Sequence, residues 1–309
     1  MSTKQLIQLP QLFRSPFLRK VAFGGYYKEL AERLEIAGLT DLLKHRLADI
    51  FESVYEILLH GYRTEYVFKN TLMKNWFLSR HSTDQSFITD EFRVGQCRVD
   101  LALFSKTSVA FEIKTDFDSS ARLASQSDAY MKVFDLIYIV TTSAMLPKLK
   151  VPPSVGILQL EKSGRLKTVR DSQSHANQTD LTTAFNCLWQ PERVSIVEQG
   201  SGPIKDVANS KIYTECWRKF RQLLPFEAQR HIVQQIRNRA YSKAVTDLVS
   251  SVPDSLKHAA LTLRATNGEA NRISAELKII PKKPNTKHTE KDEHIFSIPE
   301  RETERAACA

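Results

Sequence analysis

The sequence predicts an α/β protein in which a mixed β-sheet is flanked by helices. Apolar residues recur at helical spacing before about residue 80 and again after about residue 180, whereas residues 87–115 alternate with period two. Residues 108–141 then read as strand, helix and strand, which is typical of a parallel crossover unit. We therefore expect helices, then a mixed sheet with one crossover helix, then helices again.

The expected elements follow one another with short connections. They are helices at 40–61 and 64–79, strands at 87–94, 97–104 and 108–115, a helix at 118–134, a strand at 136–141, a hairpin with strands at 155–161 and 165–170, and helices at 180–189 and 211–263, the last broken near Pro225 and Pro253. Thr40 or Asp41 is expected to cap the first helix, and Asp118 or Ser119 the crossover helix.

Composition excludes several classes of protein. No apolar run approaches the ~18 residues of a membrane helix, so no membrane association is expected. The four cysteines are scattered without a C-x-x-C pair, which argues against zinc ribbons and disulfide scaffolds. The first twenty residues lack the pattern of a secretion signal. We expect a protein of the reducing cytoplasm.

The positive charge lies in the body of the chain. The sequence has 44 Lys and Arg against 35 Asp and Glu, and residues 281–309 hold six of each, so residues 1–280 hold 38 against 29 and all of the +9 excess. A basic body favours a polyanionic partner such as nucleic acid, although many basic proteins bind none.

Composition and pattern divide the chain into four parts. Residues 1–60 form an expected N-terminal helical extension, residues 61–170 the α/β core, and residues 171–280 a helical C-terminal region. Residues 281–309, rich in Lys, Glu, Pro and Thr, form an expected disordered tail.

Polar residues lie on two expected strands where apolar ones are usual. In residues 97–104 alternation turns Val99, Leu101 and Leu103 one way and Asp100 the other. In residues 108–115 it turns Glu112 and Lys114 away from the apolar positions. Because a central strand is usually apolar on both faces, such a strand either lies at a sheet edge or lines a site.

The Glu-x-Lys pattern alone is weak evidence for a functional site, since roughly one match is expected by chance in a chain of this length. Three other residues add to it. Glu65 shares a helix face with Phe68 and Leu72, where a carboxylate is costly unless it is paired or binds metal, although a first-turn Glu can simply favour the helix dipole. Gln126 and Tyr130, four residues apart, share a face of the crossover helix, which also fits an ordinary amphipathic boundary.

Together these residues resemble the PD-(D/E)XK nuclease superfamily, the restriction-endonuclease-like fold. The resemblance is carried by Glu65, Asp100 and Glu112-Ile113-Lys114, and by Gln126 and Tyr130 in the manner of the RecB-type branch. The resemblance covers about residues 40–170. The chain also resembles an uncharacterised bacterial family of this fold. The resemblance implies an α-β-β-β-α-β core with added N- and C-terminal helices. Val99 and Arg122 depart from the motif without removing a chemical group.

The resemblance implies a Mg²⁺- or Mn²⁺-dependent deoxyribonuclease that hydrolyses phosphodiester bonds, in bacterial DNA processing or in defence against phages and mobile elements. The implied metal ligands are Asp100, Glu112, the Ile113 carbonyl and Glu65. Lys114 would orient the attacking water, and Gln126 and Tyr130 would steady the network. Arg122, Arg237 and Arg239 are candidate nucleic-acid contacts, although solvated helix positions fit them equally well.

Two other classes of function fit the same residues. One is a non-catalytic DNA-binding or adaptor protein that keeps the nuclease fold, and the other is a module whose basic helices bind an acidic protein. Within the nuclease class, DNA and RNA, single and double strands, and internal and terminal cleavage all fit these residues.

Overall fold

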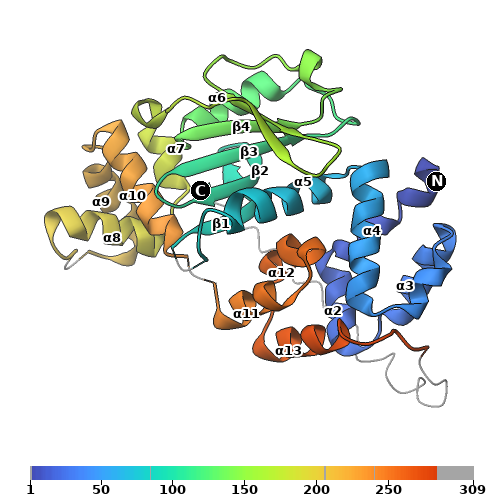
Figure 1. The fold of residues 1–309 in the computed structure, drawn as a ribbon. Coiled ribbons are helices and arrows are strands. Elements are labelled where there is room, and N and C mark those ends of the chain that lie inside the picture. Colours follow the sequence, from blue (N-terminus) through green and yellow to red (C-terminus); the bar gives the residue numbers. More distant parts are fainter. Residues whose placement is uncertain (1, 84, 205–206, 240, 284–309) are drawn as a thin grey trace.

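A six-stranded mixed sheet forms the centre of the computed structural model, which describes residues 2–83, 85–204, 207–239 and 241–283 (Figure 1). Its strands lie in chain order: β1 (Phe87–Val94), β2 (Cys97–Phe104), β3 (Ser108–Lys114), β4 (Leu136–Thr141), β5 (Gly156–Leu160) and β6 (Leu166–Arg170). β3, β4 and β5 are parallel, and the other neighbours are antiparallel. The predicted α/β class and all six predicted strands are confirmed.

Helices cover both faces of the sheet, and a separate hydrophobic cluster lies beneath each layer (Figure 1). One face packs against α4 (Leu47–Gly61), α5 (Glu65–Leu72) with its π-helical continuation Met73–Leu78, α11 (Lys243–Ser251) and α12 (Lys257–Thr262). The other packs against α6 (Leu123–Met131), α7 (Leu181–Asn186), α8 (Gln190–Ser201), α9 (Asn209–Phe220) and α10 (Pro225–Arg237). Within the described part of the chain, no helix has the length and hydropathy needed to cross a membrane.

The two ends of the described chain pack together. The N-terminal region has the helices α1 (Thr3–Leu6), α2 (Ser15–Phe23) and α3 (Tyr27–Ile36). α2 packs directly on α13 (Asn267–Glu276), and the Tyr26 hydroxyl before α3 donates to Glu276 at 2.9 Å, whereas α1 contacts α4 (Figure 1). The tail from residue 284, which the sequence predicts to be disordered, lies outside the described residues.

The predicted helix at 40–61 is divided, and the predicted caps are wrong for its main part. A 3₁₀ turn at Thr40–Lys44 is followed by extended backbone at His45 and Arg46, after which α4 begins. The Leu47 and Ala48 amides at the start of α4 donate to the Ile279 and Leu277 carbonyls, at 2.9 and 3.0 Å. Free amides at a helix start need partners, and here a distant segment supplies them.

The crossover helix is also shorter than predicted. It begins at Leu123 rather than near residue 118, with Arg122 at the N-cap position. Asp118 does not cap it, because its carboxylate accepts hydrogen bonds from the Thr115 amide and hydroxyl at 2.8 and 2.7 Å. The predicted helix at 180–189 ends at Asn186, and α8 begins at Gln190, where no helix was predicted.

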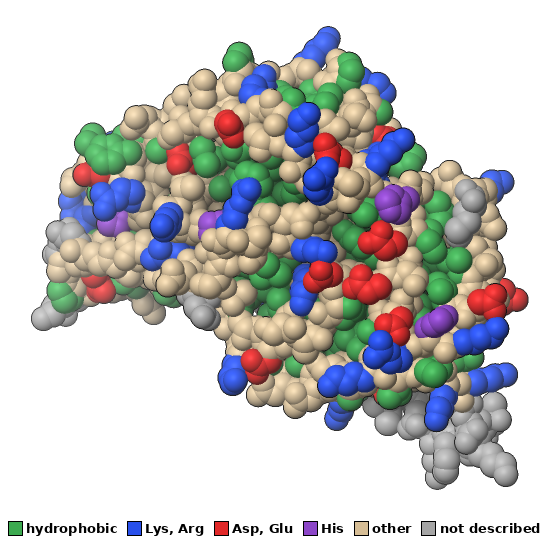
Figure 2. All heavy atoms as spheres, viewed as in Figure 1, with side chains coloured by type: hydrophobic (Ala, Val, Ile, Leu, Met, Phe, Trp, Pro, Cys, Tyr) green, Lys and Arg blue, Asp and Glu red, His purple; other side chains and the backbone are tan. Residues whose placement is uncertain are grey.

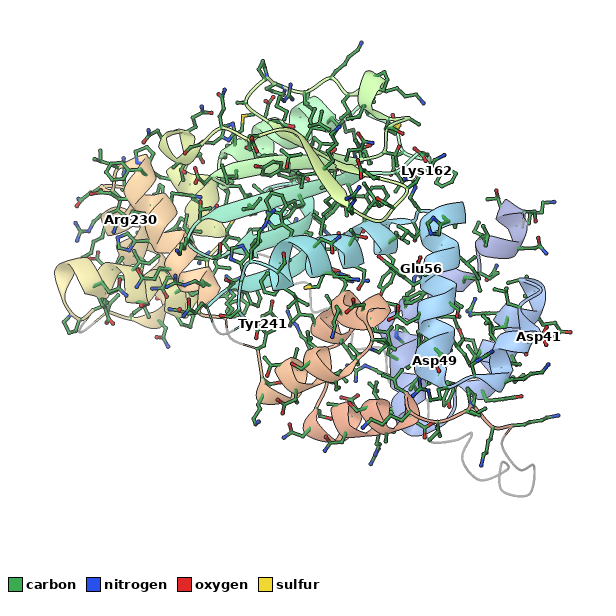
Figure 3. All side chains as sticks on the ribbon, in the orientation of Figure 1. Asp41, Asp49, Glu56, Lys162, Arg230 and Tyr241 are labelled. Carbon is green, nitrogen blue, oxygen red and sulfur yellow. The ribbon has the colours of Figure 1, made fainter. Side chains whose placement is uncertain are left out.

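Tyr241 occupies the outer edge of β1, where the chain passes from α10 to α11 (Figure 3). Its hydroxyl lies 2.7 Å from both the amide and the carbonyl of Ile88. Burial raises the pKa of this hydroxyl well above its ordinary value. The unpaired backbone groups of an exposed strand edge can pair with another chain. The Tyr241 hydroxyl provides a hydrogen-bond partner for two of these groups, the amide and the carbonyl of Ile88.

Gly156 gives a direct test of the packing around β5. A Cβ built at this position would lie 2.4 Å from the Tyr138 ring and 2.7 Å from the Ser172 amide nitrogen. We expect Gly156→Ala to lower the free energy of unfolding by about 1–3 kcal/mol, because neither a β4 ring nor a backbone atom can move freely. Denaturant unfolding measures the change.

Gly268→Ala in α13 is the matched control, since nothing lies within 4 Å of its added Cβ. We expect it to be neutral or stabilising by up to about 1 kcal/mol. Equal effects of the two substitutions would contradict the packing described here.

Candidate functional site

Strands β2 and β3 separate at a point that we call the strand fork. Their pairing ends at Leu101 opposite Phe111, although β2 begins at Cys97 and β3 continues to Lys114. Beyond that pair, the Asp100 carboxylate accepts a hydrogen bond from the Ile113 amide at 2.6 Å. A side chain thus replaces the partner that a continuing ladder would supply to this amide, and it fixes the carboxylate beside β3.

The chain changes sides at the strand fork. Strict alternation predicts Val99 on the same face as Leu101 and Leu103, but Val99 packs in the opposite cluster, with Phe92 and Phe104. This part of the prediction is wrong because the strands stop following the regular pleat. The irregularity coincides with Glu91, where φ is +53°. The β1–β2 register goes from the pair Asp90–Leu101 to the pair Phe92–Val99, so Glu91 and Asp100 lie between these two pairs.

Glu112 is the centre of a buried polar network on the α6 side of the sheet. Its Oε1 lies 2.8 Å from Lys114 Nζ and accepts from Gln126 Nε2 at 2.6 Å. Its Oε2 lies 2.7 Å from the Tyr130 hydroxyl, which is also 2.6 Å from the Arg98 carbonyl oxygen. The single Tyr130 proton can therefore link the diverging strand β2 to Glu112, and burial beside Glu112 raises the Tyr130 pKa.

This network removes one alternative left by the sequence. Lys114 and Glu112 do not form a surface pair on an edge strand, because β3 is the third of six strands and every residue in it is buried. The side chains of Glu112 and Lys114 are only 2% and 9% exposed. Burial of a charged pair is costly unless each group has further partners, and here Gln126 and Tyr130 supply them.

A group of three carboxylates lies on the other side of the strand fork. Glu65 from α5, Glu91 from β1 and Asp100 from β2 each place one oxygen within 4.8 Å of the other two. We call this group the carboxylate cluster. It contains Glu65 and Asp100 as predicted. Glu112 is not part of it, and both its oxygens bind residues of the network on β3 and α6.

Glu91 is a residue that sequence reasoning missed. The signal was available in the predicted hairpin, because pairing Val94 with Cys97 across the Gly95 turn places Glu91 opposite Asp100. Its positive φ is unusual for a residue with a side chain and costs on the order of 1–2 kcal/mol. Surrounding contacts must hold this conformation, which is a pattern found often at functional sites.

Lys69 is the cation nearest to the carboxylate cluster. Its ammonium lies 2.6 Å from Glu65, 3.5 Å from Asp90 and 3.9 Å from Glu91, and its side chain is 8% exposed. Burial alone would lower the Lys69 pKa, but Asp90 and Glu65 raise it above its ordinary value. His258 Nε2 lies 2.9 Å from Asp90, so two basic groups hold this neighbour of Glu91 in place.

Asp100 has the most perturbed carboxyl in the site. Burial and then repulsion from Glu112 raise its pKa from 3.8 to about 7, against the opposing hydrogen bond from the Ile113 amide. Glu65 adds further repulsion. Among the described residues, two cations lie within 4.0 Å of the cluster: Lys69, and Arg98, whose guanidinium is 3.8 Å from Glu91. When all three carboxylates are ionised, their negative charge exceeds the charge of these two cations by one.

The three arginines predicted as nucleic-acid contacts lie apart from this network and differ in their surroundings. Arg122 is exposed at the start of α6, and Arg237 is half-buried at the end of α10. Arg239 pairs with Glu192 at 2.7 and 2.8 Å and lies 4.0 Å over the Trp189 ring. Basic and acidic side chains are interspersed over the face in Figure 2, without one continuous basic stripe.

The fold and this site define an α/β protein with a carboxylate-rich centre where two strands of a mixed sheet separate. Residues 60–260, about two thirds of the chain, match the family model described as Bacteriophage P4 protein cII, and the chain belongs to this family.

The other comparisons add little to this assignment. A solved protein of unknown function from Silicibacter pomeroyi is 12% identical, with a TM-score of 0.28, and the match covers 50% of this chain and 82% of that one. No curated protein matches the chain.

The raised Asp100 pKa predicts how stability depends on pH without metal. Between pH 4 and 7 the folded state retains a proton that the unfolded state has lost, so this carboxyl destabilises the fold as the pH rises through that range. We expect Asp100→Asn, with a chelator present, to raise the free energy of unfolding by about 1–3 kcal/mol at pH 8 and by much less at pH 4. The amide oxygen can still accept from Ile113.

Denaturant unfolding across this pH range measures the difference. Asp247→Asn, on the exposed face of α11, is the control and should leave the profile unchanged. A gain from Asp100→Asn that is the same at both pH values would contradict ionisation of a buried Asp100 as its source.

Proposed function

We propose that this protein is a metal-dependent nuclease that hydrolyses phosphodiester bonds in DNA, built on a restriction-endonuclease-like core. The order α5, β1, β2, β3, α6, β4 supports the proposal, since it is the α-β-β-β-α-β order of that core. The strand fork is the observation that carries the proposal. There the Asp100 carboxylate on β2 accepts a hydrogen bond from the Ile113 amide on β3, between Glu112 and Lys114.

The carboxylate cluster fits a hard divalent cation such as Mg²⁺ or Mn²⁺. Three carboxylate oxygens within 4.8 Å of one another match the oxygen ligands that such ions prefer. A bound cation would also favour the ionised form of Asp100, whose pKa is raised by burial and by repulsion from Glu112. Glu65, Glu91 and Asp100 would hold the ion, with the Ile113 carbonyl as a further proposed ligand on β3. Both oxygens of Glu112, which the resemblance implies as a ligand, bind Lys114, Gln126 and Tyr130, so Glu112 would instead position Lys114. A bound ion would supply charge stabilisation and a water of lowered pKa.

Lys114 is the residue proposed to act on the attacking water and on the developing phosphate charge. Its ammonium is held by Glu112 at 2.8 Å and lies 3.4 Å from Gln126 Oε1, so its position is fixed before substrate arrives. Preorganised charge of this kind is an effective source of catalysis. Gln126 and Tyr130 act through Glu112 and are positioning residues.

The family supports a biological setting as well. Because its description names a bacteriophage, we propose a role in phage or mobile-element biology, as in bacterial DNA processing or defence.

Glu91→Gln tests the proposed metal site. We expect Mn²⁺ to raise the melting temperature of the wild-type protein, and the variant to need about ten-fold more ion or greater for the same rise, since one anionic ligand is lost. Thermal unfolding over a titration of Mn²⁺ measures this. Glu35→Gln, an exposed change on α3, is the control. An unchanged titration for Glu91→Gln would remove this residue from the site.

Lys114→Met and Glu112→Gln test the chemistry. We expect each to reduce cleavage of linear or circular DNA by about 100-fold or more with Mg²⁺ or Mn²⁺, because each removes a preorganised charge. Gel assays measure the rate, and far-UV circular dichroism checks that both variants fold. Lys44→Ala, in an exposed pair with Asp41, should cleave at the wild-type rate.

Wild-type cleavage by both variants would contradict the site. Salt-sensitive DNA binding by the wild-type protein without cleavage under either ion would instead favour the non-catalytic DNA-binding function.

A further inference from the structure

Three adjoining hollows form a continuous groove along β1. Their volumes are about 570, 510 and 750 Å³. Asp90 lines all three, and the second and third also share Thr89, Trp189, Arg239 and Arg264. We call this surface the β1 groove.

The β1 groove passes over the carboxylate cluster. Glu65 and Lys69 line its first hollow, between the N-terminal helices and α12, and Glu91 lines its second. A ligand lying along the groove would therefore meet two of the three clustered carboxylates near its middle.

Two exposed aromatic side chains lie in or near the groove. Phe117 and Trp189, at 65% and 61%, are the most exposed of the large hydrophobic side chains in the described residues. Trp189 lines the second and third hollows, and Phe117 packs at 5.2 Å on Tyr62, which lines the first. Of the two, only Trp189 lines a hollow, and an aromatic ring there offers a face on which a planar group of a ligand can stack.

Trp189 has the form of a prepared stacking platform. The Arg239 guanidinium covers one face of its indole at 4.0 Å, and Glu192 fixes that guanidinium with two hydrogen bonds. Glu192 also accepts from the Trp189 amide at 2.7 Å, and this carboxylate is buried. One face of the indole is thus braced while the side chain remains largely exposed.

The groove also offers positive charge that the protein does not use. Arg14 lines the first hollow, Arg93 the second and Arg264 the second and third. Within the described part of the chain, none of the three has a carboxylate partner within 4.0 Å. Arg264 is also held at a φ of +50°, a conformation that is costly for a residue with a side chain.

We propose that the β1 groove binds a single strand of nucleic acid across the carboxylate cluster, with bases stacked on Trp189 and phosphates on Arg264, Arg93 and Arg14. This inference rests on the proposed nuclease function and names its substrate as single-stranded. Free base faces are available only in an unpaired strand, since a duplex presents base edges and backbone to a protein.

Binding without cleavage tests this proposal. Fluorescein-labelled single strands of about 15 nucleotides, as DNA and as RNA, and a DNA duplex of equal length are titrated with EDTA present, and anisotropy gives the affinities. We expect single strands to bind more tightly than the duplex. Trp189→Ala should weaken single-strand binding about ten-fold or more, and Trp189→Phe, which keeps a stacking face, should retain most of the affinity.

Arg264→Gln should weaken binding less and should lower its salt dependence, because it removes one phosphate contact. Phe23→Ala is the matched aromatic control, since Phe23 is 51% exposed and lies beneath Arg272 outside the groove. Arg230→Gln, on α10 and labelled in Figure 3, is the arginine control. Both should bind as the wild-type protein does.

The outcomes separate this proposal from the nuclease function. Three outcomes would each overturn the proposal that the β1 groove binds a single strand. They are wild-type affinity in both Trp189→Ala and Arg264→Gln, a preference for the duplex, and no binding of single strands. Loss of binding in Trp189→Ala with retention in Trp189→Phe would support the groove even if no divalent ion supports cleavage, and in that case the nuclease function alone would fail.

Discussion

The hydrogen bond from the Ile113 amide to the Asp100 carboxylate is the interaction on which the site depends. It occurs because β2 and β3 stop pairing after Leu101 and Phe111, which frees an amide in the middle of a sheet. A buried amide needs an acceptor, and an ionised carboxyl is a strong one. The same hydrogen bond holds the Asp100 carboxylate between two sets of polar side chains that differ in how their charges are paired. On one side is the Glu112 network, and on the other the carboxylate cluster.

The two groups differ in how completely their charges are offset. Glu112 has Lys114, Gln126 and Tyr130 as partners and is closed to solvent. The carboxylate cluster has Lys69 in reach of Glu65 and Glu91 and Arg98 in reach of Glu91, and burial together with repulsion from Glu112 raises the Asp100 pKa to about 7. A network whose polar atoms all have partners is typical of a structural role, whereas a group of carboxylates with net negative charge favours the binding of a cation. This difference is why we place the proposed ion at the cluster and the proposed fixed ammonium at Lys114.

Helices from both ends of the chain complete the surroundings of the site. α5 supplies Glu65 and Lys69, the N-terminal helices form one wall of the first hollow, and α12 supplies His258 to Asp90. On the far side, the start of α8 supplies Trp189 and Glu192. The core strands alone would leave the β1 edge open. The added helices turn that edge into the β1 groove, which gives the extensions a role in ligand binding as well as in packing.

The sequence by itself determined the strands and the α/β class, because alternation and helical spacing are local properties of the chain. The grouping of Asp100, Glu112, Lys114, Gln126 and Tyr130 was predicted from the resemblance of their motif to a known family. Only the tertiary structure decided that β3 is central, that Glu91 joins Glu65 and Asp100, and that Leu277 and Ile279 cap α4. It also decided that Val99 turns to the opposite face. Each of these depends on strand order, a departure from the pleat or a contact between distant segments, and no local pattern encodes such relations.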